Sequence, residues 1–221
     1  RRKKERQMLK LPQSLNRKRF STLLQPASWL KAIPNPKEAQ NKLEFSIYAA
    51  ASLIELLKRQ RDAVGLSIFD ETLALHTAAK SSLTHHRFLY SELEKRLHVY
   101  QPTEKKQTNT AQALHDIAEL AHQRSMVLIF SDLLDDPAHT EALFDALMHL
   151  KHNKHEVILF HVFNEALEQN FDLEDRPYQL VDMETGETLR LRPAEIREKY
   201  QKALNAHFKN IEMRCLNHGI D

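Results

Sequence analysis

The sequence predicts an α/β fold in which a mostly parallel sheet is covered by helices on both faces. Continuous apolar runs such as SMVLIFSD (residues 125–132) and HEVILFHVF (residues 155–163) are typical of strands that are buried on both faces. These runs alternate with segments in which apolar residues recur at helical spacing. Such alternation favours a parallel sheet flanked by helices.

The first half of the chain predicts one long helix, two strands and a second helix. Apolar residues recur at helical spacing from Lys37 to Arg61. AVGLSIF (residues 63–69) is a short β-branched run, and TLALHTA (residues 72–78) alternates as an edge or antiparallel strand does. A helix over residues 82–99 is followed by the polar segment QPTEKKQTNT, which has no apolar period and predicts a loop.

The second half predicts three more helices, the two buried strands and a hairpin. Asp136 and Pro137 have the residue types of a helix N-cap and first helical position. YQLVDMETGETLRL consists of two short runs around ETG, which predicts a hairpin excursion. The predicted segments are helices over residues 110–123, 136–149 and 193–217, strands over 125–132 and 155–163, and the hairpin over 178–191.

Composition excludes several classes of protein and site. A single cysteine in 221 residues cannot form an internal disulfide, and no CxxC or CxxH spacing offers a zinc site. The three glycines lie too far apart for the glycine-rich loops that cradle phosphates. No apolar stretch approaches the roughly 20 residues that span a bilayer. These features predict a cytoplasmic protein with no membrane span.

The near-neutral net charge of +2 is the sum of two unlike parts. Residues 1–20 carry nine Lys or Arg and one Glu, a net of +8, and the remainder carries −6. We therefore divide the chain into a basic arm, residues 1–22, and a single domain, residues 23–221. Basic arms can attract the phosphates of nucleic acid or anionic lipid. This arm lacks interleaved aromatic residues, which favours a solvated or docked tail, with nucleic-acid binding as an alternative.

Oxygen-bearing side chains follow the central strand and precede one helix. Ser131 and Asp132 end the strand SMVLIFSD, and Thr108 and Thr110 stand before the helix that begins near residue 110. Ligands of open α/β sheets bind at the carboxyl ends of the strands. A carboxylate with hydroxyls suits Mg²⁺ or Mn²⁺, whereas the same residue types are also common helix caps. Both interpretations stay open at this stage.

Histidine and cysteine give weaker signals. His149, His152 and His155 are spaced three apart but run from a helix into a strand, so they would not share one face, and we expect them to be solvated or capping residues. Cys215 lies on the last helix, where a small packing role is the simplest interpretation.

Five segments, in this order and spacing, carry a resemblance to a known family. They are NKLEFSIYAAASLIELLKRQRDAVGLSIFDE, TNTAQALHDIAE, RSMVLIFSDLLDD, HLKHNKHEVILFHV and RPYQLVDMETGETLRLRP. The chain from about Asn41 to Asp221 resembles the von Willebrand factor A-like half of the bacterial "domain of unknown function 58" proteins. This resemblance implies a Rossmann-like A-type domain, truncated at both ends relative to the family, with Phe20–Leu24 as its candidate first central strand.

The resemblance also implies a metal-ion-dependent adhesion site built from three loops. Carried over by position, its residues are Ser28 from the first loop, Thr108 from the second and Asp132 after the central strand. Gln25 stands where the family's first-loop Asp is expected. A neutral amide cannot replace a carboxylate, so we expect a degenerate site that binds Mg²⁺ weakly or not at all.

These observations lead to one preferred function and two alternatives. The preferred function is a noncatalytic protein–protein interaction module, and the resemblance implies a MoxR-type AAA+ ATPase as a partner in assembly or chaperone-like roles. The first alternative is a metal-dependent phosphoryl-transfer or hydrolytic enzyme that uses Asp132 with Asp135 or Asp136, which requires a further acidic ligand from another element. The second is nucleic-acid binding through the basic arm.

Overall fold

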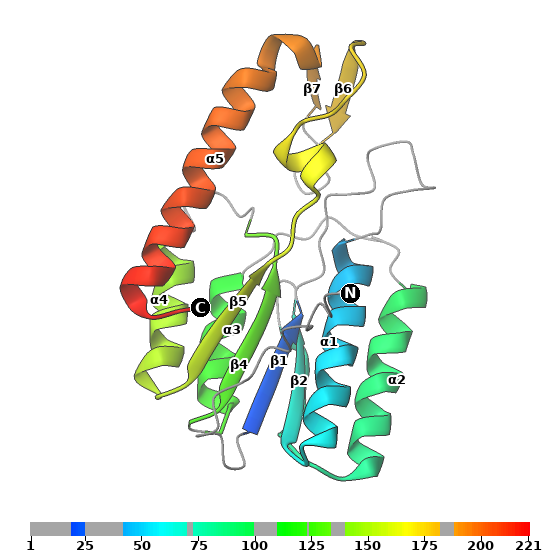
Figure 1. Ribbon diagram of the computed structural model, residues 1–221, viewed down its shortest axis with the longest axis vertical. Coiled ribbons are helices and arrows are strands. Elements are labelled where there is room, and N and C mark those ends of the chain that lie inside the picture. The colour runs from blue at the N-terminus through cyan, green and yellow to red at the C-terminus, as the bar shows by residue number, and fades with distance from the viewer. Residues whose placement is uncertain are drawn as a thin grey trace, which may run out of the picture.

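A five-stranded sheet with the order β3-β2-β1-β4-β5 forms the centre of the computed structural model (Figure 1). The structure describes residues 19–24, 42–69, 73–99, 110–122, 124–133, 140–181 and 188–221. β1 (Arg19–Leu24) lies between β2 (Ala63–Phe69) and β4 (Met126–Ser131), with β5 (Glu156–His161) beyond β4 and β3 (Leu73–His76) beyond β2. All neighbouring strands are parallel except β3, which is antiparallel to β2. The predicted α/β class and mostly parallel sheet are confirmed.

β1 is the central strand of the sheet, so the candidate first strand at Phe20–Leu24 does lie there. Its residue Thr22 is paired with Leu66 of β2 on one side and with Leu128 of β4 on the other. The strand begins at Arg19, so the residues from Arg19 to Thr22, which the sequence analysis assigns to the basic arm, lie within the sheet.

Helices cover both faces of the sheet (Figure 1). α1 (Lys42–Arg59) and α2 (Leu83–Val99) lie on one face. α3 (Thr110–Leu120), α4 (Thr140–His152) and the C-terminal half of α5 (Pro193–His218) pack on the other. α4 continues past the predicted end at residue 149. α5 ends at His218 and is followed by Gly219, whose φ of 62° is the left-handed conformation typical of the residue after a helix.

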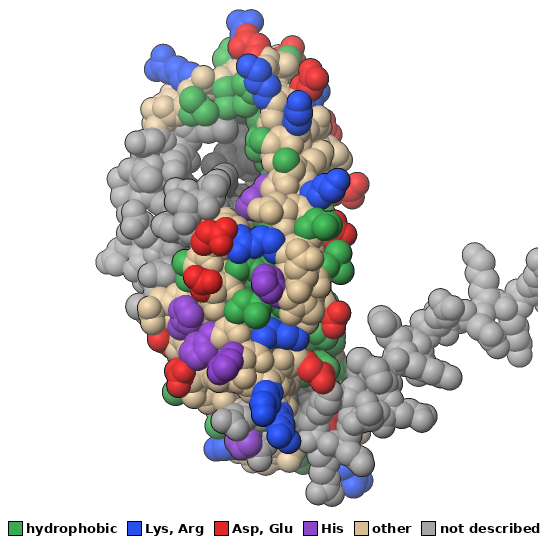
Figure 2. All heavy atoms as spheres, turned by 90° about the vertical axis from the view of Figure 1, so that its left-hand side faces the viewer, with side chains coloured by type: hydrophobic (Ala, Val, Ile, Leu, Met, Phe, Trp, Pro, Cys, Tyr) green, Lys and Arg blue, Asp and Glu red, His purple; other side chains and the backbone are tan. Residues whose placement is uncertain are grey.

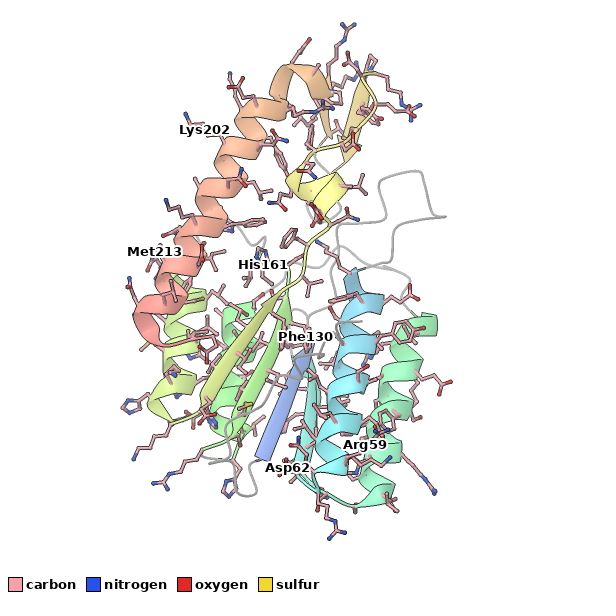
Figure 3. The ribbon with its side chains drawn as sticks, viewed as in Figure 1. Arg59, Asp62, Phe130, His161, Lys202 and Met213 are labelled. Carbon is pink, nitrogen blue, oxygen red and sulfur yellow. The ribbon has the colours of Figure 1, made fainter. Side chains whose placement is uncertain are left out.

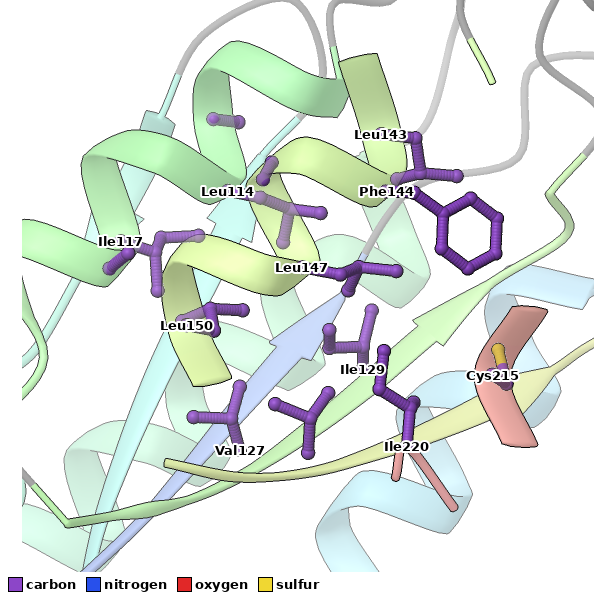
Figure 4. Close-up of a cluster of buried hydrophobic side chains, with 14 of the residues drawn as sticks. Leu114, Ile117, Val127, Ile129, Leu143, Phe144, Leu147, Leu150, Cys215 and Ile220 are labelled. Atoms are coloured by element: carbon purple, nitrogen blue, oxygen red, sulfur yellow. The ribbon is translucent and has the colours of Figure 1, made fainter. Parts of the chain in front are cut away.

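The core is divided by the sheet into two apolar clusters. Successive side chains of a strand point to opposite faces, so Leu128 and Phe130 of β4 pack with α1 and α2, whereas Val127 and Ile129 pack with α3 and α4. Figure 4 shows the second cluster, which includes Cys215 near the end of α5. The packing role expected for this cysteine is confirmed.

The segment after β3 crosses closely over Gly65 of β2. Thr77 is held there by hydrogen bonds with Leu66: its backbone N–H donates to the Leu66 carbonyl at 2.9 Å, and its Oγ1 accepts from the Leu66 N–H at 2.8 Å. A Cβ at Gly65 would lie 2.5 Å from the Thr77 carbonyl oxygen. Only glycine allows the two backbones to approach this closely.

We therefore expect Gly65→Ala to lower the free energy of unfolding by about 1–3 kcal/mol, because the added methyl forces the backbone at Thr77 to shift. Urea denaturation followed by circular dichroism would measure the change. A variant as stable as the wild type would contradict the close contact.

The segment between β5 and α5 forms a short π-helix and a hairpin. The hairpin of β6 (Tyr178–Val181) and β7 (Thr188–Leu191) is antiparallel, as predicted. The π-helix η3 (Glu165–Gln169) was not anticipated in the sequence. Side chains of α5 hold the residues that follow it, since Arg197 donates to the carbonyls of Phe171 and Leu173 at 3.2 and 3.1 Å. α5 therefore fixes the position of η3 relative to the sheet.

Within the described residues, we find no helix whose length and apolar character would let it cross a bilayer.

Candidate functional site

The loop that follows β4 lies at the carboxyl end of the sheet. Because β1, β4 and β5 are parallel, they end at the same edge, with Leu24 paired to Phe130 and Ser131 paired to His161. Polar residues begin where the buried strand ends, at Ser131 and Asp132, both of which are buried. This edge is the place where open α/β sheets bind their ligands.

The backbone of this loop is held in an unusual conformation. Leu133 has a φ of 52°, in the left-handed region that side-chain-bearing residues seldom adopt. Histidine rings from two elements bind the loop carbonyls: His161 Nε2 lies 3.0 Å from the Asp132 oxygen, and His207 Nε2 of α5 lies 2.9 Å from the Leu133 oxygen. The Leu133 N–H donates to Ser131 Oγ at 3.1 Å. These contacts fix where the Asp132 side chain can point.

His161 lies at the end of the sheet beside α5 (Figure 3). Its ring meets the ring of Phe208 edge to face, with the centroids 4.4 Å apart. Burial lowers the pKa of His161, only partly offset by the hydrogen bond to the Asp132 carbonyl. The neutral ring therefore donates its Nε2 proton to the loop and adds no positive charge beside Asp132.

Asp132 is bound by an ammonium group from another element. Its Oδ2 lies 2.9 Å from Nζ of Lys42, and the same Nζ lies 2.6 Å from Oε1 of Glu168. The side chains of Lys42, Asp132 and Glu168 are only 3%, 9% and 12% exposed. We call these three residues the Lys42 triad. Ion pairs shielded from water to this degree are stable only when each charge keeps its partner.

Lys42 can contact Asp132 and Glu168 because it lies on the buried face of α1. It is the first residue of that helix and precedes Ser46, Ala50 and Ile54 at helical spacing, all of which are buried. Ser46 Oγ donates to the Lys42 carbonyl at 2.8 Å, within the first turn. The side chain therefore extends under the end of the sheet and not into solvent.

Glu168 is held in η3 by its own local hydrogen bonds. Its Oε2 accepts from the backbone N–H of Asn164 at 2.9 Å, while the Asn164 side chain accepts from the Leu167 N–H at 3.0 Å. Reciprocal bonds of this kind satisfy the free N–H groups at a helix start. Tyr200 of α5 lies close by, and its pKa is raised by burial and by the charge of Glu168. The second carboxylate is thus held by contacts within η3 as well as by Lys42.

The triad does not fit a magnesium site as it stands. A lysine ammonium occupies the space that two carboxylates share, and it offsets one of the two negative charges that would attract a divalent ion. Among the residues that the structure describes, no group of three or more His, Cys, Asp or Glu side chains could hold a metal ion. The described residues instead form an ion-paired contact between α1, the β4 loop and η3, in which one ammonium group faces two carboxylates.

Of the three residues assigned to the adhesion site, only Asp132 falls within the described part of the chain. Ser28 and Thr108 lie outside it, as do Gln25 and the acidic residues at 135 and 136. Their meeting with Asp132 stays a prediction. Ser131 and Thr110, the other oxygen-bearing candidates that are described, are both buried.

Lys42 and Glu168 were not among the predicted site residues. Lys42 is spaced from the buried residues of α1 so that it lies on their face of the helix. This spacing was the signal that could have indicated a buried charge.

The histidine prediction is wrong at one position. His155 is 2% exposed, and its Nδ1 accepts a hydrogen bond from the Ser125 backbone N–H at 3.2 Å. Burial lowers its pKa, so the ring is a neutral core residue and not a solvated one. His155 directly precedes β5 and lies beside Ser125 just before β4, a proximity that is not visible in the local sequence. β5 itself is an edge strand that is buried only at Val157, so the prediction that this strand is buried on both faces is wrong.

Two solved structures resemble this chain over most of their lengths. The conserved hypothetical protein BatB from Bacteroides thetaiotaomicron is 14% identical, with 91% of this chain and 98% of that chain covered and a TM-score of 0.50. An aerotolerance-related membrane protein from Bacteroides fragilis NCTC 9343 is also 14% identical, with 84% and 87% covered and a TM-score of 0.46. At this identity the likeness to BatB shows the fold alone.

No curated protein matches the chain. A family model does match, and its description is "Protein of unknown function DUF58". The match extends over residues 36–210, which include α1, the strands β2 to β7 and most of α5. The chain therefore belongs to the DUF58 family, as its sequence motifs indicated.

Proposed function

We propose that this protein is a noncatalytic protein–protein interaction module, a von Willebrand factor A-type domain whose metal-ion-dependent adhesion site is degenerate. The observation that carries the proposal is the buried ion pair between Lys42 and Asp132. In this proposal the lysine ammonium supplies the positive charge that a bound metal ion supplies in an intact site. The site then has a structural role, and partner binding does not require Mg²⁺.

The arrangement of the sheet supports the A-type assignment. β1 is central, and its last residue, Leu24, is level with Phe130, next to the loop that carries Asp132. The first and third loops of an adhesion site would therefore begin at neighbouring points of one edge. The strand order β3-β2-β1-β4-β5 also follows the doubly wound pattern of Rossmann-like domains.

The proposed partner is a MoxR-type AAA+ ATPase, in an assembly or chaperone-like process. The proposed contact surface is the carboxyl edge of the sheet around Asp132, together with Ser28 and Thr108. Asp132 itself is 9% exposed and engaged with Lys42, so it is expected to shape this surface rather than to bind the partner directly.

A magnesium titration of the thermal unfolding temperature tests the degenerate site. We expect millimolar Mg²⁺ to leave the melting temperature of the full chain unchanged, since a ligand stabilises a protein only when it binds the folded state. Sodium chloride at matched ionic strength is the control for screening of surface charge. A rise that saturates at micromolar Mg²⁺ would show a functioning metal site and overturn this part of the proposal.

The partner is tested separately, by measuring binding of the full chain to a MoxR-type ATPase from the same genome. Nucleotide-free ATPase keeps the partner's own magnesium requirement out of the measurement. We expect the same affinity with and without Mg²⁺. Binding that depends on Mg²⁺ would contradict the role given to Lys42, and absence of binding in both buffers would contradict the choice of partner.

One observation favours the enzymatic alternative as a second candidate. A metal-dependent hydrolase or phosphoryl-transfer enzyme needs a further acidic group beside Asp132, and Glu168 comes within reach of the same lysine. Such an enzyme would have to move Lys42 to admit a metal ion. Hydrolysis of a generic phosphate ester in the presence of Mn²⁺, abolished by Asp132→Asn, would favour the enzyme over the interaction module. Nucleic-acid binding by the basic arm stays a prediction, since residues 1–18 lie outside the described part.

A further inference from the structure

Two histidines on neighbouring helices point their ring nitrogens at each other. Nδ1 of His115 on α3 lies 3.0 Å from Nδ1 of His149 on α4, and the ring centroids are 5.3 Å apart. On its other side, His149 Nε2 lies 2.9 Å from Oε1 of Glu119. We propose that His115 and His149 bind a divalent transition-metal ion, Zn²⁺ or Ni²⁺, through these two Nδ1 atoms.

The separation of the two nitrogens is close to what a metal ion needs. Zinc binds imidazole nitrogen at about 2.0–2.1 Å in tetrahedral geometry, which places two such ligands about 3.3 Å apart. The observed 3.0 Å is shorter than this by a few tenths of an ångström, and both rings must also turn so that their Nδ1 electron pairs converge on the ion instead of pointing along the line between the two nitrogens. Neutral imidazole is a preferred ligand of Zn²⁺ and Ni²⁺, whereas Mg²⁺ prefers oxygen.

Glu119 sets the tautomer that metal binding requires. When the His149 Nε2–H donates to this carboxylate, the neutral ring keeps a free electron pair on Nδ1, directed at His115. A carboxylate behind a histidine is the common second partner of metal-bound imidazoles, where it fixes the ring and raises its basicity. With His149 in that tautomer, His115 would donate the proton between the two Nδ1 atoms, and it would carry that proton on Nε2 when a metal ion takes its place.

The two helices hold the pair in place before any ion binds. Leu114 and Ile117 of α3 pack in one apolar cluster with Leu147 and Leu150 of α4 (Figure 4). One turn further along, the Asn153 side chain donates to the Ala118 carbonyl at 2.9 Å and ties the helix ends together. Ligands on rigid elements need little further ordering, which favours binding.

Histidine side chains gather on the face that carries α4 and α5 (Figure 2). No group of three or more metal-binding side chains occurs among the described residues, so water would complete the coordination of an ion at His115 and His149. We therefore expect weaker binding than at a structural zinc site with four protein ligands. The pair belongs to α3 and α4, and its test is independent of the Lys42 triad and of the proposed function.

Isothermal titration of the untagged full chain with ZnCl₂ and with NiCl₂, at neutral pH, tests the proposal directly. An untagged chain is necessary because a histidine tag would bind the same ions. We expect one ion per chain and a melting temperature that rises with metal concentration. His115→Ala and His149→Ala should each weaken binding at least tenfold, and Glu119→Gln should weaken it by about tenfold through the tautomer of His149.

His152→Ala is the matched control, because His152 is an exposed histidine at the end of the same helix and outside the pair. It should bind metal as the wild type does, and circular dichroism should show each variant folded. A wild type that binds neither ion would show that the pair is only a hydrogen bond between two rings. Binding that survives His149→Ala, or that is lost in His152→Ala, would place the site elsewhere. Either result overturns the proposal.

Discussion

Replacing Lys42 by methionine is expected to lower the free energy of unfolding by about 3–5 kcal/mol, because it leaves the buried carboxylate of Asp132 and the partly buried carboxylate of Glu168 without their cation. Methionine keeps most of the apolar length of the side chain, so the packing on α1 changes little. The loss therefore reports the charge. Urea unfolding, with comparison of the slope of the transition, would separate lost stability from a change in compactness.

Two further variants make this result specific. Lys58→Met removes a lysine from the same helix whose partner, Glu55, is on the surface, and it should change stability little. Adding Asp132→Asn and Glu168→Gln to Lys42→Met should restore much of the loss, because no uncompensated charge remains buried. If Lys42→Met lowers the free energy of unfolding no more than Lys58→Met does, the triad is not shielded from water. The ion pair would then no longer support the proposed function.

Phe144→Ala is expected to cost about 3–5 kcal/mol as well, for a different reason. Phe144 is 1% exposed and fills the space between α4, the sheet and α5 (Figure 4). The guanidinium of Arg214 on α5 lies 4.0 Å from the centre of its ring, and Arg214 also binds Glu141 through two hydrogen bonds of 2.7 and 2.8 Å. The alanine variant leaves a cavity and removes the platform on which α5 rests.

Thermal and urea unfolding of Phe144→Ala, beside Phe144→Leu, would measure this contribution. Leucine fills much of the volume but offers no aromatic face, so Phe144→Leu should retain most of the stability. Glu141→Gln removes only a surface partner and should remain close to the wild type. A Phe144→Ala protein as stable as the leucine variant would show that α5 does not depend on this contact.

Most of the fold could be predicted because the spacing of apolar residues in the sequence matches the buried faces of the helices and the buried strands of the sheet. β4 is buried at every residue, and its continuous run of apolar letters had predicted that. The first strand is the exception. RFSTLL is short and partly polar, and only the resemblance to a family suggested Phe20–Leu24 as a central strand. η3 was missed because Asn164 and Glu168 complete each other's hydrogen bonds over too few residues to give a periodic signal.

The candidate site was predicted only at Asp132, because the other members of the triad depend on long-range contacts. Lys42 and Asp132 are 90 residues apart, and Lys42 and Glu168 are 126 residues apart. A lysine at the start of a helix is ordinarily solvated, so its charge alone does not indicate burial. The pairing of His115 with His149 likewise requires knowing that α3 and α4 are neighbours.

The Lys42 triad has one more consequence. A cation that is part of the chain is present once per molecule and cannot be diluted, exchanged or depleted from the surroundings. The attraction between Lys42 and Asp132 is therefore part of the free energy of folding. Unlike the contribution of a bound metal ion, it does not depend on the concentration of that ion in solution. The cation stays at this edge of the sheet for as long as α1, the β4 loop and η3 stay together.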